Sequence, residues 1–192
     1  MSMDGKHRSF QEQVEKQPDY RYDVRNEIII NNDTMIFEEE YNVKVLMLNG
    51  SAKTNGNTYA SLLEVGRQLE KEGIEYEIFQ MGGEPVRDCL GCGQCTENGC
   101  VFADDKVNEF VAKAKEADGF VFGTPVYYAH PSGRVMSFLD RAFYSSGSAA
   151  FAFKPGASVA VARRGGTTAS FDAMNKYFGI CQMPVAGSTY WN

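Results

Sequence analysis

The clearest pattern along the chain is an alternation of short apolar runs with longer segments in which apolar residues recur every three or four positions. The short runs predict strands, and the longer segments predict amphipathic helices. Continuous apolar runs are typical of parallel strands buried on both faces, so we expect an α/β fold with a doubly wound sheet. The expected strands cover residues 43–48, 74–79, 119–123, 157–162 and 183–188, and the expected helices cover 58–72, 132–144 and 168–178, with another opening at Asp104.

Residues 1–42 break this pattern because they are polar and acidic. They hold 10 of the 25 Asp and Glu residues but 5 of the 19 Lys and Arg residues, together with two short apolar patches at 28–30 and 35–37. No chemical motif occurs among them. We therefore predict an N-terminal extension over residues 1–42 and one α/β domain over residues 43–192.

The formal net charge is -6, and most of it comes from the extension. No basic stripe is present, which argues against nucleic acid or an anionic membrane surface as a partner, since both require clustered Lys and Arg. No apolar run reaches the roughly 18 residues of a spanning helix, and the first residues lack the apolar segment of a secretory signal. These features predict a cytoplasmic protein.

The loop after the first expected strand is rich in glycine, asparagine and hydroxyl residues. It joins that strand to a helix N-terminus, where unpaired backbone N–H groups favour an anion. Neither the Walker A nor the dinucleotide glycine spacing fits it, which leaves a terminal phosphomonoester such as that of FMN. The alternative is an ordinary polar loop that Asn57 or Thr58 caps. Side chains that would add donors are Ser51, Lys53, Asn57 and Thr58.

Two further loops follow the expected strands at 119–123 and 157–162. The first places Pro125, Tyr127 and Tyr128 where a flat ring system would rest, and the second carries Arg163 and Arg164. Ligands of open α/β sheets gather beyond the carboxyl ends of the strands, so these loops belong to the same candidate site. Simpler alternatives are a loop that packs on the core and a solvated basic turn.

Four of the five cysteines lie in the spacing Cys89-x2-Cys92-x2-Cys95-x4-Cys100. Such a cluster in a reducing compartment is typical of a metal or cluster site rather than of disulfides. The short glycine-rich loop fits a 4Fe-4S cluster. A four-thiolate zinc site and thiols without metal, including a redox-labile pair, stay open as alternatives.

These segments together carry a family resemblance. The chain resembles the NADPH-dependent FMN reductase family over roughly residues 43–192. The segments that carry the resemblance are Gly50–Thr58, the cysteine loop, residues 117–128, Asp140-Arg141, Ala162–Gly166 and Tyr190–Asn192. The branch that this chain is similar to includes iron–sulfur flavoproteins and is related to the multimeric NAD(P)H:quinone reductases.

The resemblance implies a flavodoxin-like, five-stranded parallel sheet that binds FMN in a homo-oligomer, a dimer or tetramer, with the flavin near a subunit interface. It also implies NADPH or NADH as electron donor and Cys89, Cys92, Cys95 and Cys100 as cluster ligands. The FMN phosphate would be held by Ser51, Lys53, Asn55, Asn57 and Thr58, and the ring would lie along Pro125, Val126, Tyr127 and Tyr128, with Arg163, Arg164 and Gly165 at its other edge.

The chain departs from the family in one respect, because members usually continue past the Tyr-Trp-Asn segment into a last helix. Here the chain stops at Asn192. We therefore expect either a truncated sequence or a sheet face covered by residues 1–42 or by another subunit.

The leading functional hypothesis is an FMN-dependent oxidoreductase that passes electrons from NAD(P)H to a quinone, flavin or protein acceptor. The alternatives are an electron carrier that binds FMN and a cluster without its own NAD(P)H site, and a zinc-stabilised flavin-binding or sensor protein. No catalytic side chain is expected, because the cofactor carries the chemistry. His130 is expected to make a structural contact, Asp140 and Arg141 an ion pair or subunit contact, and Cys181 to be a small buried residue.

Overall fold

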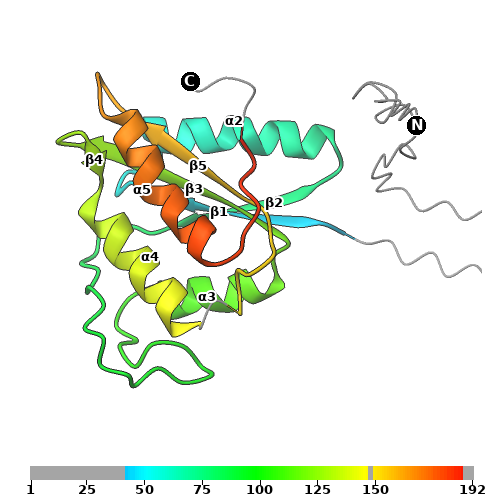
Figure 1. Cartoon of the computed structure of the whole chain (residues 1–192). Helices are drawn as coiled ribbons and strands as arrows, with labels where there is room; N and C mark the ends of the chain where they lie inside the picture. The colour runs from blue at the N-terminus through cyan, green and yellow to red at the C-terminus, as the bar shows by residue number, and fades with distance from the viewer. Residues whose placement is uncertain (1–41, 147–148, 188–192) are drawn as a thin grey trace, which may run out of the picture. The chain divides into compact units, whose positions relative to one another are not determined.

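The computed structural model describes residues 42–146 and 149–187 (Figure 1). Of the expected N-terminal extension, only Asn42 falls within this part of the chain. The Tyr190–Asn192 segment lies outside it as well. Within the described residues, no helix combines the length and the apolar character needed to cross a membrane.

The sheet is mostly parallel. Strands β2, β1, β3 and β5 lie side by side in that order, and each pair of neighbours is parallel. The short strand β4 pairs with the end of β3 in the antiparallel direction. The bounds are β1 Lys44–Asn49, β2 Glu75–Gln80, β3 Gly119–Tyr127, β4 His130–Pro131 and β5 Gly156–Val161.

Helices cover both faces of the sheet, as Figure 1 shows, with α2 on one side and α3 and α4 on the other. The main core lies on the α3 and α4 side and also includes Met174 and Phe178 of α5. Burial of these apolar side chains is the main favourable term in folding. The bounds are α2 Asn57–Lys71, α3 Val107–Glu116, α4 Gly133–Ser145 and α5 Thr167–Ile180.

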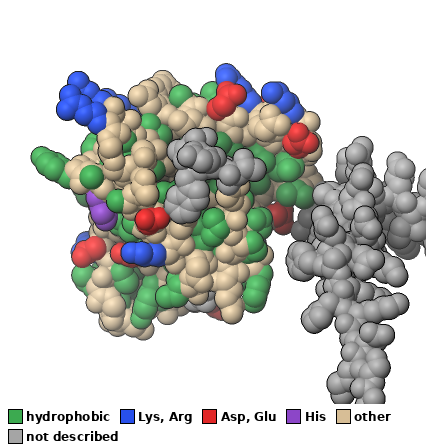
Figure 2. All heavy atoms as spheres, turned by 45° about the horizontal axis from the view of Figure 1, so that its top comes forward, with side chains coloured by type: hydrophobic (Ala, Val, Ile, Leu, Met, Phe, Trp, Pro, Cys, Tyr) green, Lys and Arg blue, Asp and Glu red, His purple; other side chains and the backbone are tan. Residues whose placement is uncertain are grey.

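Aromatic side chains dominate the main core. Phe110 packs edge to face with both Phe122 and Phe138, and Phe143 stacks on Phe151 with ring centroids 4.0 Å apart. A smaller core lies under α2, where Met47, Leu62 and Val121 are buried. Figure 2, which brings the α2 side of Figure 1 forward, shows apolar side chains scattered over this face, with several charged side chains among them.

The α/β fold and the mostly parallel, five-stranded, flavodoxin-like sheet are confirmed, but the position of one strand differs from the prediction. Residues 183–187 form no strand and contribute a single parallel bridge between Val185 and Gly156. Pro184 has no N–H group to donate to a ladder, which limits pairing there. The fifth strand is β4 instead.

One helix also starts later than expected. The α3 helix begins at Val107 rather than at Asp104. The reason is local, because the Asp105 carboxylate accepts a hydrogen bond from the Val107 N–H group at 3.1 Å and so closes a turn ahead of the helix.

Candidate functional site

One pocket of about 440 Å³ gathers residues from the loops after β1, β3 and β5. In a parallel sheet the carboxyl ends of neighbouring strands meet at one edge, which is where this pocket lies. Three loops that are far apart in the sequence therefore form a single site. Its lining is Ser51, Lys53, Gly56, Asn57, Thr58, Pro125, Val126, Tyr127, Val161, Ala162 and Arg163.

The loop after β1 begins with a close backbone approach. The Gly50 N–H group donates to the Gly123 carbonyl at 2.9 Å. A Cβ atom at position 50 would lie 2.1 Å from Cγ2 of Val135 and 2.6 Å from that carbonyl oxygen, so only glycine fits.

Two side chains from neighbouring strands support this loop from beneath. The Asn49 Oδ1 atom accepts from the Ser51 N–H group at 3.2 Å, and its Nδ2 group donates to the Lys53 carbonyl at 3.3 Å and to Gln80 Oε1 at 2.5 Å. The Gln80 Nε2 group donates in turn to the Ser51 carbonyl at 2.7 Å. The conformation of the loop is therefore fixed without any ligand contact.

The N-terminus of α2 has no side-chain cap. Gly56 is the cap residue, with extended backbone, and the first turn contains no acidic residue. The Ser51 hydroxyl oxygen accepts from the Lys53 N–H group at 3.1 Å instead of bonding to the helix. The alternative of a loop capped by Asn57 or Thr58 is therefore wrong. Uncapped N–H groups at a helix start favour an anion, and here they lie beside a pocket.

The opposite wall of the pocket ends in a tight hairpin. Tyr128 and Ala129 have φ of 51° and 58°, so two non-glycine residues adopt left-handed backbone between Tyr127 and His130. The Tyr128 side chain is fully exposed. The loop after β5 packs closely against this hairpin, because a Cβ at Gly166 would lie 2.4 Å from Cα of Ala129.

Most of the predicted site residues come together in the pocket, but four do not line it. The pocket lining also includes three residues that were not predicted as site residues: Gly56, Val161 and Ala162. They could have been found from their position, because they lie at the ends of α2 and β5. The predicted residues outside the lining are all exposed: Asn55, Tyr128, Arg164 and Gly165.

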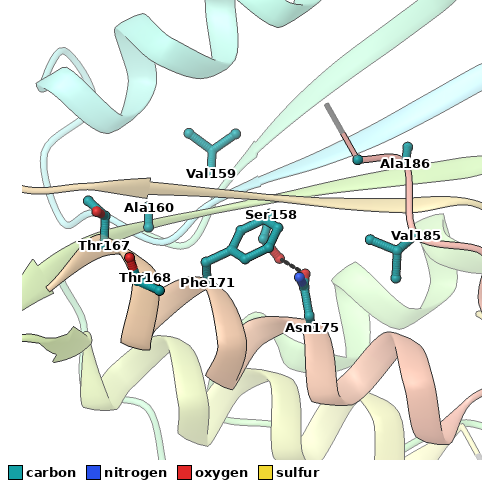
Figure 3. A pocket seen from close by; sticks show the side chains of 10 residues that line it. Ser158, Val159, Ala160, Thr167, Thr168, Phe171, Asn175, Val185 and Ala186 are labelled. Atoms are coloured by element: carbon teal, nitrogen blue, oxygen red, sulfur yellow. Dashed lines mark hydrogen bonds between the residues drawn. The ribbon is translucent and has the colours of Figure 1, made fainter. Parts of the chain in front are cut away.

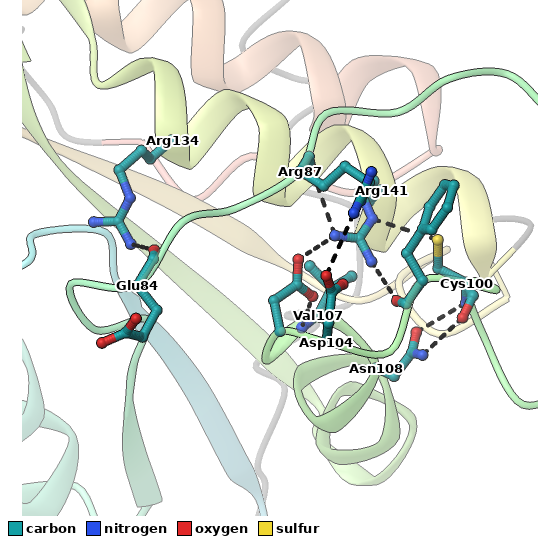
Figure 4. Close-up of polar contacts among 10 residues, drawn as sticks. Glu84, Arg87, Cys100, Asp104, Val107, Asn108, Arg134 and Arg141 are labelled. Carbon is teal, nitrogen blue, oxygen red and sulfur yellow. Dashed lines mark hydrogen bonds and ion pairs between the residues drawn. The ribbon is translucent and has the colours of Figure 1, made fainter.

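The cysteine loop lies between β2 and α3 and is attached to the domain by polar contacts (Figure 4). Asn108 of α3 exchanges two hydrogen bonds of 2.8 Å with the backbone of Cys100. Arg141 of α4 is 1% exposed and forms an ion pair with the Asp105 carboxylate. It also donates to the Phe102 carbonyl at 2.6 Å and to the Arg87 carbonyl at 3.4 Å.

The Arg141 guanidinium also contacts a cysteine, since its Nε donates to Cys100 Sγ at 3.4 Å. Burial by itself lowers the pKa of Arg141, but the contacts with Cys100 and Asp105 outweigh burial and raise it. The expectation of an ion pair at Arg141 is confirmed. Asp140 makes a different contact, accepting from the Tyr177 hydroxyl at 2.5 Å.

The four loop thiols are near one another without forming a metal-binding group. Burial raises the pKa of the Cys95 thiol, and the charges of Cys100, Cys92 and Cys89 raise it further, with Cys100 acting most strongly. Among the described residues, no three His, Cys, Asp or Glu side chains are placed to hold a metal ion.

A second pocket of about 480 Å³ lies between β5, α5 and residues 185–187 (Figure 3). Thr168, Phe171 and Asn175 point from α5 toward β5, where the Ser158 hydroxyl donates to Asn175 Oδ1 at 3.0 Å. Its lining contains no charged side chain and no part of the loop after β1. It shares one feature with the first pocket, the uncapped start of α5 at Thr167 and Thr168, but it lacks a basic side chain and the loop after β1.

Two remaining expectations concern single residues. The exposed His130 ring contacts the Pro131 carbonyl through Nδ1 at 3.1 Å, which is the structural contact expected for it. Cys181 is buried, also as expected.

Comparisons with known proteins agree with this geometry. The model of the NADPH-dependent FMN reductase family matches residues 43–192. An iron–sulfur flavoprotein of Methanocaldococcus jannaschii is 34% identical over 148 residues, which is 76% of each chain. Another from Archaeoglobus fulgidus is 33% identical over 99 residues, 52% of this chain and 48% of that one.

Solved structures show the same fold at low sequence identity. FerB, a flavoenzyme NAD(P)H:(acceptor) oxidoreductase from Paracoccus denitrificans, aligns with a TM-score of 0.57 at 15% identity, covering 79% of this chain and 80% of that one. The family match spans the whole α/β domain. The chain therefore belongs to the NADPH-dependent FMN reductase family and is an NAD(P)H-dependent flavin oxidoreductase.

Proposed function

We propose that this protein holds FMN in the pocket formed by the loops after β1, β3 and β5, and passes electrons from NAD(P)H to a quinone, flavin or protein acceptor. The observation that carries the proposal is the meeting of an uncapped helix start, an aromatic loop and an arginine loop around one pocket. Each loop alone is compatible with a simpler role.

The phosphate is assigned to the loop after β1. The backbone N–H groups at the start of α2 and the hydroxyls of Ser51 and Thr58 donate to it, and Lys53 and Asn55 at the rim supply charge and a further donor. The absence of acidic residues in the first turn of α2 favours a dianion there. Asn57 is the fifth residue that we assign to the phosphate.

The ring is assigned to the space between the β3 and β5 loops. Pro125, Val126 and Tyr127 present apolar and aromatic surface, and Arg163 supplies hydrogen-bond donors for the carbonyl edge of the ring. FMN supplies hydride acceptance from a nicotinamide and electron donation to an acceptor, while the chain orients the ring and leaves room for the donor. Tyr128, Arg164 and Gly165 lie at the exposed rim.

The exposed Tyr127 and Tyr128 beside this pocket favour a homo-oligomer, a dimer or tetramer, in which a second subunit approaches the flavin. Sedimentation velocity tests this assembly, and a monomer over micromolar concentrations would contradict it.

We also propose Cys89, Cys92, Cys95 and Cys100 as ligands of a 4Fe-4S cluster, because two relatives are iron–sulfur flavoproteins and four thiols form a soft donor set. Gly91, Gly93 and Gly99 all have positive φ, which gives the loop backbone conformations that other residues disfavour. The donor chemistry fits a cluster, whereas the present arrangement of the thiols does not. Ligation therefore requires the loop to change conformation.

An anaerobic visible spectrum of the purified protein, recorded before and after addition of NADPH or NADH, tests the proposal. We expect flavin bands that either nucleotide bleaches. Bound flavin without bleaching at millimolar nucleotide would favour the electron-carrier alternative, and no flavin after incubation with FMN would overturn the proposal. Iron and sulfide analysis after reconstitution tests the cluster separately, and zinc in their place would support the zinc-site alternative.

A further inference from the structure

Part of the cysteine loop folds as a small hairpin. Thr96 and Gly99 exchange both backbone hydrogen bonds, each of 3.0 Å, around the two-residue turn Glu97–Asn98. The Asn98 N–H group is also bonded to the Thr96 hydroxyl at 3.2 Å. Cys95 and Cys100 flank this pair directly, so each occupies the next position outward on its arm.

That position has a definite geometry. In an antiparallel pair, the residues next to a hydrogen-bonded pair form a non-hydrogen-bonded pair, whose Cα atoms are about 4.5 Å apart and whose side chains are close. A disulfide requires Cα atoms about 4.4–6.8 Å apart. Thr96 and Gly99 form an isolated pair and Gly99 has a φ of 107°, so the arms are not a regular ladder, but the two bonds between them hold Cys95 and Cys100 at neighbouring ends of the hairpin.

The thiols of Cys95 and Cys100 are also near each other. Of the other three loop cysteines, Cys100 acts most strongly on the Cys95 thiol, ahead of Cys92 and Cys89. Cys92, by contrast, is exposed. Among the three possible partners of Cys95, the loop therefore favours Cys100.

Cys100 is held in place from the core side. Asn108 binds its backbone, and Arg141 binds its sulfur. Gly99 is required for this arrangement, because its φ is 107° and an added Cβ would lie 2.6 Å from Oδ1 of Asn108. The Cys100 sulfur is therefore fixed, and the hairpin places Cys95 near it.

From this geometry we infer that Cys95 and Cys100 form a redox-active dithiol pair that closes to a disulfide when the loop carries no metal. The oxidant is a small-molecule disulfide. One cysteine sulfur attacks it, forms a mixed disulfide and releases one small thiol, and the other cysteine then displaces the second small thiol. The pair loses two protons and two electrons, and the oxidant is reduced to two thiols.

Closing the disulfide removes two of the four proposed cluster ligands. The oxidised loop therefore does not accept iron and sulfide, whereas the reduced loop does. This consequence rests on the proposed 4Fe-4S site, but the disulfide itself does not.

Mass spectrometry of the full chain tests the inference. Metal-free protein is equilibrated anaerobically with glutathione and glutathione disulfide, alkylated and digested with trypsin, which leaves all four loop cysteines on residues 88–106. Cleavage after Glu97 then separates Cys89, Cys92 and Cys95 from Cys100. We expect the two fragments to stay joined through Cys95, with Cys89 and Cys92 alkylated.

Variants separate pre-organisation from simple thiol reactivity. Cys89→Ser and Cys92→Ser should keep the disulfide, and Cys95→Ser and Cys100→Ser should lose it. Gly99→Ala, which retains all four thiols, should lower the equilibrium constant for forming the disulfide about tenfold. Unfolding the unmodified protein in urea should lower the same constant by about the same factor. Circular dichroism verifies that each variant folds.

Three outcomes would overturn the inference: a random distribution of linked pairs, equal loss in Cys92→Ser and Cys95→Ser, or equal closure in native and urea-unfolded protein. The proposed cluster is judged by another readout. If neither the reduced nor the oxidised protein takes up iron, the cluster proposal fails, while a Cys95–Cys100 disulfide would still stand.

Discussion

The Nε group of Arg141 on α4 donates to Sγ of Cys100 across 3.4 Å. The buried guanidinium of this helix therefore contacts the cysteine loop directly. The same guanidinium pairs with Asp105 and bonds the carbonyls of Arg87 and Phe102. Arg87 precedes the cysteines, and Phe102 and Asp105 follow them. One side chain therefore anchors both ends of the loop.

Replacing this side chain should cost much of the stability of the domain. Arg141→Met leaves the Asp105 carboxylate, whose side chain is 5% exposed, without its partner. Breaking a buried pair by removing one member typically costs about 3–5 kcal/mol. Urea unfolding measures this loss. The matched control is Arg67→Met, because Arg67 pairs with Glu64 at the surface and should contribute under about 1 kcal/mol. Equal effects of the two substitutions would contradict the account.

A charge at the start of α2 should act in opposite directions on stability and on FMN binding. Asn57→Asp places a carboxylate beside uncapped N–H groups, which should stabilise the free protein by about 0.3–1 kcal/mol. The same carboxylate should repel the phosphate and weaken FMN binding about tenfold or more. Thermal unfolding without ligand and a fluorescence titration measure the two effects. Unchanged FMN affinity would place the phosphate elsewhere.

The aromatic wall should contribute to ring binding irrespective of the phosphate. Tyr127→Ala removes an aromatic surface of the pocket, and such contacts are worth about 0.5–1.5 kcal/mol beyond buried area. We expect FMN and riboflavin to lose affinity by a similar factor, about threefold to tenfold. Tyr144→Ala, an exposed tyrosine on α4 outside both pocket linings, is the control. A loss confined to FMN would contradict the assignment of the ring.

The acid sensitivity of the domain should depend in part on Glu77. Burial raises the pKa of this carboxyl, but hydrogen bonds from Lys113 and Lys44, at 2.9 and 3.2 Å, outweigh burial and lower it. A carboxyl with a lowered pKa binds fewer protons in the folded than in the unfolded state. Its stabilisation is therefore present above about pH 4.3 and is lost as the pH falls through the folded pKa.

The corresponding substitution is Glu77→Gln. Urea midpoints measured between about pH 6 and pH 3 should fall less steeply in this variant than in the parent protein. Glu64→Gln, at an exposed pair, should leave the slope unchanged. Parallel curves for the parent and the Glu77 variant would contradict the proposed role of the two lysines.

The sequence predicted most helices and strands because their apolar periodicity is local. It also predicted which loops meet, since a parallel sheet places the carboxyl ends of its strands at one edge. It missed the support of the loop after β1, because the contact between Asn49 and Gln80 depends on the pairing of β1 with β2. No local signal marks such a pair.

The sequence also did not predict the partners in polar contacts between residues far apart in the chain. An ion pair at Arg141 was expected, but its partner Asp105 lies 36 positions away, and only the packing of α4 against the cysteine loop brings them together. Within the described part of the strand expected over residues 183–188, which is 183–187, the prediction failed because Val185 alone pairs with the sheet. Apolar composition alone does not show where a ladder ends.

The most direct test of the central claim is to compare the affinity of the unmodified protein for FMN with its affinity for riboflavin, which has the same ring and no phosphate. Two charge-assisted hydrogen bonds to the phosphate, at about 1.5 kcal/mol each, correspond to roughly 100-fold. We predict that FMN binds tighter than riboflavin by at least about this factor. Equal affinities would show that the loop after β1 holds no phosphate, and would contradict the placement of FMN in this pocket.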